Sequence, residues 1–496
     1  MSRLITCFIP VSDRESMAST IEALRATGLV SKIYVLAADG QAPDLKGTGA
    51  EVLTVDALTS TGAVKRMAGI SETEYTVIYT KTFPLDPGSF ALNRMVQVCH
   101  DTGAGMVYSG YYENKQGKLL PHPLIDYQQG SLRDDFGFGS LLFYRTEALR
   151  KAAGSISEEY LFAGLYDLRL KVSQGYPVIY IPELLYTEVE TDTRKTGEKQ
   201  FDYVDPRNRT VQIEMEKACT SHLKKTGGWL KPDFRRVDLA CDKFDNEASV
   251  IIPVRNRMKT ISDAVSSVLS QKTMCRFNLI VVDNHSTDGT TDILKQFAAT
   301  DSRLIHHIPE RTDLGIGGCW NEGVFHENCG RFAIQLDSDD IYIDNTVIQK
   351  IVDAFYEQNC AMVVGSYRMV NFNLEEIPPG IIDHREWTPD NGRNNALRIN
   401  GLGAPRAFFT PVLRKIRIPN VSYGEDYAVG LAISRRYQIG RIYEPLYLCR
   451  RWEDNSDAEL DIAKMNAHNF YKDRIRTIEL MARIRMNEGG GSGIVA

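Results

Sequence analysis

The chain repeats itself, and this repeat limits the possible folds more than any other feature of the sequence. The segment FIPVSDR at 8–14 matches IIPVRNR at 251–257. Near the end of each copy, YPVIYIPELLY at 176–186 aligns without a gap against YQIGRIYEPLY at 437–447. In both copies short apolar runs alternate with amphipathic helical stretches, which indicates βαβ units and a largely parallel sheet. We therefore expect one α/β domain to occur twice.

The repeat divides the chain into four predicted segments. These are α/β domains at 1–195 and 247–456, a helical connector at 196–246, and a C-terminal segment at 457–496. In the connector, Asp205 can cap a helix and Pro206 suits the first helical position. The glycine pair that begins at Gly227 is expected to end that helix.

Length, charge and cysteine content exclude several classes of protein. A chain of 496 residues suits two domains of roughly 200 residues each better than one core. The net charge of −6 gives no reason to expect nucleic-acid binding, and no apolar run approaches the ~20 residues of a membrane span. The nine cysteines form no C-x-x-C pair and the N-terminus does not resemble a signal peptide, so we expect free thiols in a cytoplasmic protein.

The C-terminal segment predicts a basic helix. Residues 464–485 hold six Lys and Arg side chains against two acids, and apolar residues between Tyr471 and Ala482 share one side. The simpler interpretation is a helix packed on its own domain with a solvated basic face. The alternative is peripheral contact with an anionic membrane surface. The run GGGSG at 489–493 has the composition of a flexible linker.

Three carboxylates follow a predicted strand in the second copy. Asp337, Asp339 and Asp340 come directly after the apolar run 332–336, at the strand end where open α/β sheets bind ligands. Closely spaced carboxylates repel one another unless they are neutralised, and a hard divalent cation with oxygen ligands does this. The plainer alternative is a polar turn with Asp340 or Asp344 as a helix cap.

Other polar segments of the second copy occupy comparable places. Asp283 and Asn284 follow the strand 279–282 and could accept hydrogen bonds from a base or a ribose, or could cap a helix. The later run LGIGGCWNE opens a helix with glycines, which permit close backbone approach to a diphosphate. Glu425 and Asp426 open another helical run, where a carboxylate could take a proton from a hydroxyl or simply favour the helix N-terminus.

In this order, the segments SVIIPVRN, VDNHSTDGT, GIGGCWN, DSDD, GEDY and RRW resemble those of family-2 glycosyltransferases of the GT-A fold. The resemblance covers about 247–456, and the joint match is specific. It implies two tandem Rossmann-like nucleotide-diphospho-sugar transferase domains with mixed, mostly parallel sheets. There are two departures from the family's pattern. Asn284 and His285 stand where the family commonly has Asp-Gly, and the run ending in Trp452 lacks the full Q-x-x-R-W element, which counts against processive polymerisation.

The resemblance also implies roles for individual residues. The donor nucleotide would be bound by Pro253, Val254, Arg255, Asp283, Asn284, Gly315, Asp337 and Ser338. The acceptor and the diphosphate would lie near Gly403, Arg406, Arg451 and Trp452. Asp339, together with Asp337, would hold Mn²⁺ or Mg²⁺. Asp426 would be the general base, with Glu425 beside it to orient the acceptor or the base.

The implied reaction is an inverting, metal-dependent transfer of a hexosyl or N-acetylhexosaminyl group. The donor would be a nucleotide-diphosphate sugar, and UDP is the commonest nucleotide in the family. The acceptor would be a hydroxyl of a glycan or of a lipid-linked or other molecule. If the basic C-terminal helix touches lipid, we expect assembly of surface polysaccharide or lipid-linked glycan at the inner membrane face.

The first copy lacks the acids at all three places. Thr80-Lys81-Thr82 stands at the position of Asp337-Ser338-Asp339, Ala37-Ala38 at that of Asp283-Asn284, and Gly164-Leu165 at that of Glu425-Asp426. A lysine at such a place would repel a divalent cation. We therefore expect a non-catalytic copy that binds the acceptor or orients its partner. A metal-independent activity that uses Asp39 or Asp167, or a polymerase with two working sites, is the alternative.

Two other functions remain open from the sequence. A sugar nucleotidyltransferase also uses an α/β fold and carboxylate-bound Mg²⁺, but it would want a glycine-rich basic loop after the first strand, which neither copy has. A catalytically silent glycan-binding scaffold would not need the acids that the second copy keeps. Release of nucleoside diphosphate, of pyrophosphate, or of neither distinguishes the three.

Overall fold

The computed structural model describes residues 4–41, 43–189, 205, 208–452, 455 and 460–489. Pro206, part of the predicted connector and the tail beyond 489 lie outside the described residues. The chain divides into two compact units. Unit 1 comprises Met1–Lys199, Thr210–Gly228 and Leu460–Leu480, and unit 2 comprises Gln200–Arg209, Trp229–Glu459 and Met481–Ala496.

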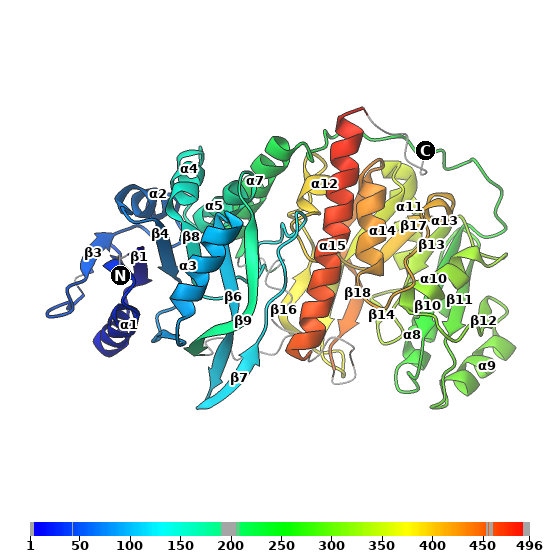
Figure 1. Ribbon diagram of the computed structural model, residues 1–496. Helices are drawn as coiled ribbons and strands as arrows, with labels where there is room; N and C mark the ends of the chain where they lie inside the picture. The colour runs from blue at the N-terminus through cyan, green and yellow to red at the C-terminus, as the bar shows by residue number, and fades with distance from the viewer. Residues whose placement is uncertain are drawn as a thin grey trace. The chain divides into compact units, whose positions relative to one another are not determined.

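Unit 1 contains a mixed sheet with the strand order β3-β2-β1-β4-β8-β6-β9-β5, and β7 pairs with β6 (Figure 1). The strands are β1 (Ile5–Pro10), β2 (Val30–Ala37), β3 (Glu51–Thr54), β4 (Tyr75–Tyr79), β5 (Asp86–Pro87), β6 (Met106–Lys115), β7 (Lys118–His122), β8 (Leu141–Arg145) and β9 (Val178–Val189). Strands β1 to β4 pair in parallel, and β8 is antiparallel to both β4 and β6.

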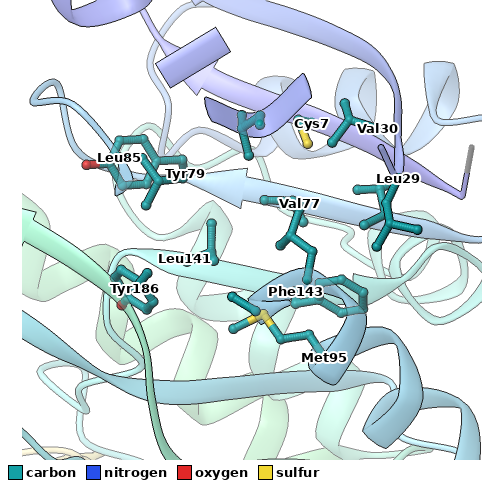
Figure 2. Close-up of a cluster of buried hydrophobic side chains, with 14 of the residues drawn as sticks. Cys7, Leu29, Val30, Val77, Tyr79, Leu85, Met95, Leu141, Phe143 and Tyr186 are labelled. Carbon is teal, nitrogen blue, oxygen red and sulfur yellow. The ribbon is translucent and has the colours of Figure 1, made fainter. Parts of the chain in front are cut away.

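Helices cover both faces of this sheet. They are α1 (Arg14–Ala26), α2 (Thr61–Ile70), α3 (Ala91–Thr102), α4 (Thr146–Gly154) and α5 (Gly164–Ser173). Because side chains alternate along a strand, Cys7 and Val77 join one apolar cluster while Phe8 and Ile78 join another. The first cluster, part of which is drawn in Figure 2, packs against α1 and α3. The second packs against α2, α4 and α5, so the sheet lies between two helical layers.

Helix α7 (Arg209–Thr226) packs on unit 1 through a carboxylate contact. Glu214 accepts hydrogen bonds from the backbone N–H groups of Leu161, Phe162 and Ala163 at 3.2, 2.7 and 3.1 Å. These N–H groups lead into α5 and have no partner inside that helix, so an acceptor from outside satisfies them. The helix ends before Gly227, whose φ of 81° is accessible to glycine at little cost.

Unit 2 has the strand order β12-β11-β10-β13-β17-β15-β18-β14, and β16 pairs with β15 (Figure 1). Its strands are β10 (Ala248–Val254), β11 (Phe277–Asp283), β12 (Leu304–His307), β13 (Phe332–Gln335), β14 (Ile341–Tyr342), β15 (Met362–Val370), β16 (Glu376–Ile382), β17 (Arg406–Phe409) and β18 (Ile439–Arg450). Its helices are α8 (Ile261–Leu269), α9 (Thr290–Thr300), α10 (Ile316–Phe325), α11 (Val347–Gln358), α12 (Gly392–Asn395), α13 (Thr410–Ile416) and α14 (Glu425–Ser434). Each strand from β10 to β18 takes the place of one from β1 to β9, in the same order. This identity supports the internal repeat, and the predicted mixed α/β sheets are confirmed.

Helix α15 (Ile462–Asn487) does not present one solvated basic face, which corrects that expectation. Three of its six basic residues are buried, namely Lys472, Arg476 and Arg483. Arg476 donates to Asp473 at 2.8 Å, and Arg133 lies 3.3 Å from the same buried carboxylate. Buried charges need such partners, so these side chains serve packing rather than a membrane surface. Among the described residues, no helix is long and apolar enough to cross a membrane.

Candidate active site

The carboxyl ends of β10, β11 and β13 meet at one edge of the unit 2 sheet. Val254 pairs with Asp283 where β10 and β11 end, and β13 ends just before Asp337. The antiparallel pairing of β14 with β18 sets Ile341 opposite Leu448, so the end of β18 returns to the same edge. Residues that the sequence placed after separate strands are therefore neighbours.

Asp340 is fixed by internal hydrogen bonds. The Tyr447 hydroxyl donates to its Oδ2, and the backbone N–H of Arg450 donates to Oδ1 at 2.7 Å. Burial, together with repulsion from Asp339 and Asp337, raises the pKa of Asp340 well above its usual value. With both oxygens engaged, Asp340 ties β18 to the turn after β13.

Asp337 is largely buried in the same network. Its Oδ1 accepts from Gln335 at 2.8 Å, and its Oδ2 lies 3.3 Å from the Tyr447 hydroxyl. Burial raises the pKa of Asp337, and the charge of Asp339 adds to this, whereas Arg406 acts in the opposite direction. The adjacent Ser338 is buried, and its carbonyl accepts from the Thr260 hydroxyl at 3.0 Å.

Asp339 is more accessible than Asp340, and three neighbouring side chains contact one of its oxygens. Trp452 Nε1 and Asn455 Nδ2 donate to Oδ2 at 3.3 and 3.1 Å, and Arg257 Nε lies 3.9 Å from it. Among the described residues, no group of three or more His, Cys, Asp or Glu is placed to hold a metal. Mg²⁺ commonly takes only one or two carboxylates and completes its shell with substrate phosphates, so Asp337 and Asp339 fit such an ion.

Asp283 is fully buried and holds the loop that follows β11. It accepts from the Ser286 backbone N–H at 3.0 Å and from the Thr291 hydroxyl and His306 Nε2 at 2.6 and 3.1 Å. Burial opposes its ionisation, but these hydrogen bonds outweigh burial and lower the pKa of Asp283. His306, on β12, was not found from the sequence because a lone histidine in a strand carries no pattern.

Asn284 presents an acceptor that the chain does not use. Its Nδ2 donates to the carbonyl of Leu314 at 2.9 Å, and its backbone N–H donates to Val254 at 2.8 Å. Its Oδ1 is buried and has no hydrogen-bond partner among the described residues. A buried polar atom without a partner costs free energy, which makes this oxygen a candidate for contact with a ligand.

The loop after β10 is tied to the loop after β11. Asn256, at φ 53°, receives the Thr287 N–H on its Oδ1 at 2.8 Å and donates its own N–H to Ser286 at 3.0 Å. Of the predicted nucleotide residues on this side, Pro253 is half-buried, Val254 is buried and Arg255 is exposed. The two loops thus form one polar rim.

The glycines at the start of α10 have a packing role that the sequence did not reveal. A Cβ on Gly317 would overlap the carbonyl oxygen of Pro419, and one on Gly315 would lie 2.7 Å from the carbonyl carbon of Val421. The N–H of Gly315 donates to Asn420 Oδ1 at 2.7 Å. The close backbone approach expected for a diphosphate is thus made by the chain's own segment before α14.

Arg406 links the acids of β13 and α14. Its Nη1 lies 2.6 Å from Asp426 Oδ2, and its backbone N–H donates to Gln335 Oε1 at 3.1 Å, while Gln335 also donates to Asp337. Beside Asp426, burial and the charge of that neighbour raise the pKa of Glu425 to about 8. Glu425 Oε2 is buried, and within the described part of the chain it has no hydrogen-bond partner. Gln335, which connects the two groups, is a residue that sequence reasoning missed.

The end of β18 brings a further set of side chains to Asp339. Arg450, rather than the predicted Arg451, is the buried arginine, and its Nη2 lies 3.0 Å from Asp263. The backbone N–H of Arg451 donates to the carbonyl of Val370 at 2.7 Å. Gly403 has a φ of 98°, and its carbonyl accepts from Arg406 at 2.9 Å. Of these predicted residues, Arg406 and Trp452 have side chains that contact the site acids.

The corresponding edge of unit 1 carries a different set of charges. Lys81 Nζ lies 3.8 Å from the buried Glu188 on β9. Burial raises the pKa of Glu188, and Lys81 acts in the opposite direction. Asp167 is also buried, which raises its pKa to about 6, and it lies 3.9 Å from Lys171. Unit 1 therefore carries the ammonium group of Lys81 at the sheet edge that corresponds to the acidic edge of unit 2.

Comparisons with known proteins identify relatives of this chain. The family described as Glycosyl transferase family 2 matches residues 249–416. The Escherichia coli protein named UDP-Glc:alpha-D-GlcNAc-diphosphoundecaprenol beta-1,3-glucosyltransferase WfgD is 35% identical over 205 residues, which cover 40% of this chain and 74% of that protein. The glycosyltransferase TuaG of Bacillus subtilis (strain 168) is 28% identical over 189 residues, with 38% and 72% covered. Among solved structures, S. aureus TarS 1-349 in complex with UDP-GlcNAc matches at 20% identity and a TM-score of 0.37, with 48% and 73% covered.

Proposed function

The chain belongs to glycosyl transferase family 2, and from this premise we propose that unit 2 transfers a sugar from a UDP-sugar to a hydroxyl of a glycan or lipid-linked acceptor, with inversion. One observation carries the proposal. Asp337 and the Arg406–Asp426 pair are joined through Gln335 at one edge of a single sheet, and Asp339 follows Asp337 at that edge. That edge is where an open α/β sheet binds its ligand.

The nucleotide of the donor would lie on the rim formed by the loops after β10 and β11. The unused Asn284 Oδ1 supports a uracil base, whose ring N–H needs an acceptor. Asp283, with its three internal donors, would hold the rim in shape rather than bind the base itself. The similarity to the Escherichia coli UDP-Glc-dependent relative WfgD supports this choice of nucleotide.

The diphosphate end would be neutralised by a divalent cation. Mn²⁺ or Mg²⁺ held by Asp339 and Asp337 would supply positive charge beside the leaving diphosphate. Burial raises the pKa of Asp337 and Asp340, and repulsion from neighbouring carboxylates adds to it, which supports a site that gains from added positive charge. Asp340, engaged by Tyr447 and Arg450, would remain a structural residue.

Asp426 would take the acceptor proton. Its ion pair with Arg406 favours the carboxylate form, whereas Glu425, with a pKa of about 8, holds its proton near neutral pH. A base placed in this way contributes roughly 10²–10⁴-fold in rate. Unit 1, with Lys81 and Glu188 at the equivalent edge, would be the non-catalytic copy. The proposal also includes the predicted domain limits, 1–195 and 247–456, and a cytoplasmic location.

The test is nucleoside diphosphate release from a panel of nucleotide sugars, with and without Mn²⁺. We expect the wild-type protein to release nucleoside diphosphate from a UDP-sugar. Asp339→Ala should lose both this release and metal-dependent donor binding. Asp426→Asn should lose transfer but still bind the donor. Asp344→Asn is the matched control, because this acid caps the turn before α11 through Thr346 and lies outside the network. Pyrophosphate release would point to the nucleotidyltransferase, and absence of turnover with every donor to the scaffold.

A further inference from the structure

The hairpin between β15 and β16 holds two apolar side chains out to solvent in unit 2. Phe372 is 41% exposed and Leu374 is 40% exposed. The tip is well ordered by its own hydrogen bonds, because Asn371 Oδ1 accepts from the N–H groups of Asn373 and Glu375, both at 3.0 Å. Exposed apolar side chains on an ordered turn often mark a binding surface when they adjoin a functional site.

Phe372 adjoins the candidate active site through Trp452. The two rings lie 5.1 Å apart at an interplanar angle of 45°. Arg450 lies 5.2 Å from the Phe372 ring, and Lys259 lies 5.4 Å from the Trp452 ring. Because Trp452 Nε1 also donates to Asp339, the aromatic surface is continuous with the acid expected to hold the metal.

The internal repeat offers a comparison for this surface. Asn114 of β6 pairs with Val189 of β9, and Val370 of β15 pairs with Arg450 of β18. Because β9 and β18 are counterparts, Asn114 corresponds to Val370. Two residues further on, Gln116 therefore corresponds to Phe372. Unit 1 therefore has no aromatic residue at the tip of the same hairpin, just as it lacks the acids. Within this one chain, the aromatic tip and the acids occur together.

We propose that Phe372 and Trp452 form an aromatic platform that binds the pyranose ring of the acceptor beside Asp339. The C–H face of a pyranose packs on an aromatic ring, while its hydroxyl groups need polar partners nearby. The tip supplies these at Asn373 and Glu375, which are exposed. The rings adjoin Asp339 of the candidate active site through Trp452, so an acceptor sugar suits the tip better than a membrane. This inference rests on the proposed function, because it assigns the acceptor side of that site.

The test measures binding of the β-methyl glycosides of glucose, galactose and N-acetylglucosamine by saturation-transfer NMR, in the presence of UDP and Mn²⁺. We expect at least one glycoside to bind with its ring protons against the protein. Phe372→Ala should weaken that dissociation constant about tenfold, and Phe372→Trp should preserve it. Gln116→Ala, at the equivalent tip of unit 1, should leave it unchanged. UDP binding is the check that Phe372→Ala retains a folded donor site.

The platform is wrong if no glycoside binds the wild-type protein, or if Phe372→Ala binds as tightly as wild type. Phe372-dependent binding to phosphatidylglycerol vesicles without glycoside binding would assign the tip to lipid and also overturn the proposal. If a glycoside binds through Phe372 while no nucleotide sugar is turned over, the platform stands and the transfer reaction fails. The two hypotheses are therefore separable.

Discussion

Acidic residues only a few positions apart have different surroundings in unit 2, and these surroundings decide what each can do. Asp340 accepts hydrogen bonds on both oxygens and is buried, whereas the contacts of Asp339 gather on Oδ2. Asp283 is likewise saturated, by three donors. A carboxylate whose lone pairs serve the fold has less left for a ligand, so Asp339 keeps more acceptor capacity for a metal than Asp340 does.

This difference predicts opposite phenotypes for two neighbouring substitutions. Asp340→Asn sets an amide donor against the Tyr447 hydroxyl or the Arg450 N–H, and we expect it to lower the free energy of unfolding by about 1–3 kcal/mol. Asp339→Asn should change stability by less than about 0.5 kcal/mol. Urea denaturation compares the two variants. A larger loss of stability in Asp339→Asn than in Asp340→Asn would contradict the structural role of Asp340.

Glu425 makes the stability of the folded protein depend on pH. Its pKa rises from 4.5 to about 8 on folding, so the folded chain retains a proton that the unfolded chain releases. Stability therefore falls as the pH increases between these two values. We expect Glu425→Gln to match wild type near pH 4.5 and to be the more stable protein at pH 8. Thermal unfolding at both values tests this, and equal stability of the two proteins at pH 8 would count against a buried acid.

At the scale of elements, the start of α10 shows how a glycine run can serve packing. Gly315, Gly317 and Gly318 let this helix approach the segment that precedes α14, and Asn420 accepts the N–H of Gly315. That segment leads directly into Glu425 and Asp426. The glycines thus let α10 pack against the segment that positions the acids of α14.

Two glycine substitutions separate packing from helix propensity. Gly317→Ala would force its Cβ into the Pro419 carbonyl, and we expect a loss of about 1–3 kcal/mol in stability together with reduced turnover. The Cβ added by Gly69→Ala in α2 would meet no atom within 4 Å, so we expect this variant to gain about 0.5–1 kcal/mol in stability. Denaturant midpoints measure both effects, and a stable, fully active Gly317→Ala would show that the approach of α10 is unimportant.

For the whole molecule, the same strand order in both units leaves chemistry to a few side chains at the sheet edge. Unit 2 carries Asp337 and Asp339 there, and unit 1 carries the Lys81–Glu188 pair. The fold alone does not confer activity, because function depends on the residues of the site. One architecture therefore carries two different sets of charged residues at the same sheet edge.

This contrast predicts unequal effects of substitutions at equivalent edges. Asp339→Ala in unit 2 should lower nucleoside diphosphate release by at least about 100-fold, because charge on the leaving group is no longer offset. Lys81→Ala in unit 1 should leave the rate within about twofold, since its partner Glu188 takes no part in the reaction. Steady-state rates with the same donor compare the variants. A collapse of turnover in Lys81→Ala with the fold intact would show that unit 1 takes part in catalysis.

The sequence by itself determined that an α/β pattern occurs twice, that its polar motifs follow strand ends, and that only the second copy keeps the acids. These features are local, because strand periodicity and the residue after a strand can be read from neighbouring positions. Tertiary structure alone decided that Asp340 is structural, that Gln335 and Arg406 connect two acidic groups, and that Phe372 meets Trp452. Such contacts join positions about 70 to 110 residues apart, as in the 71 residues between Gln335 and Arg406, and no local pattern encodes them.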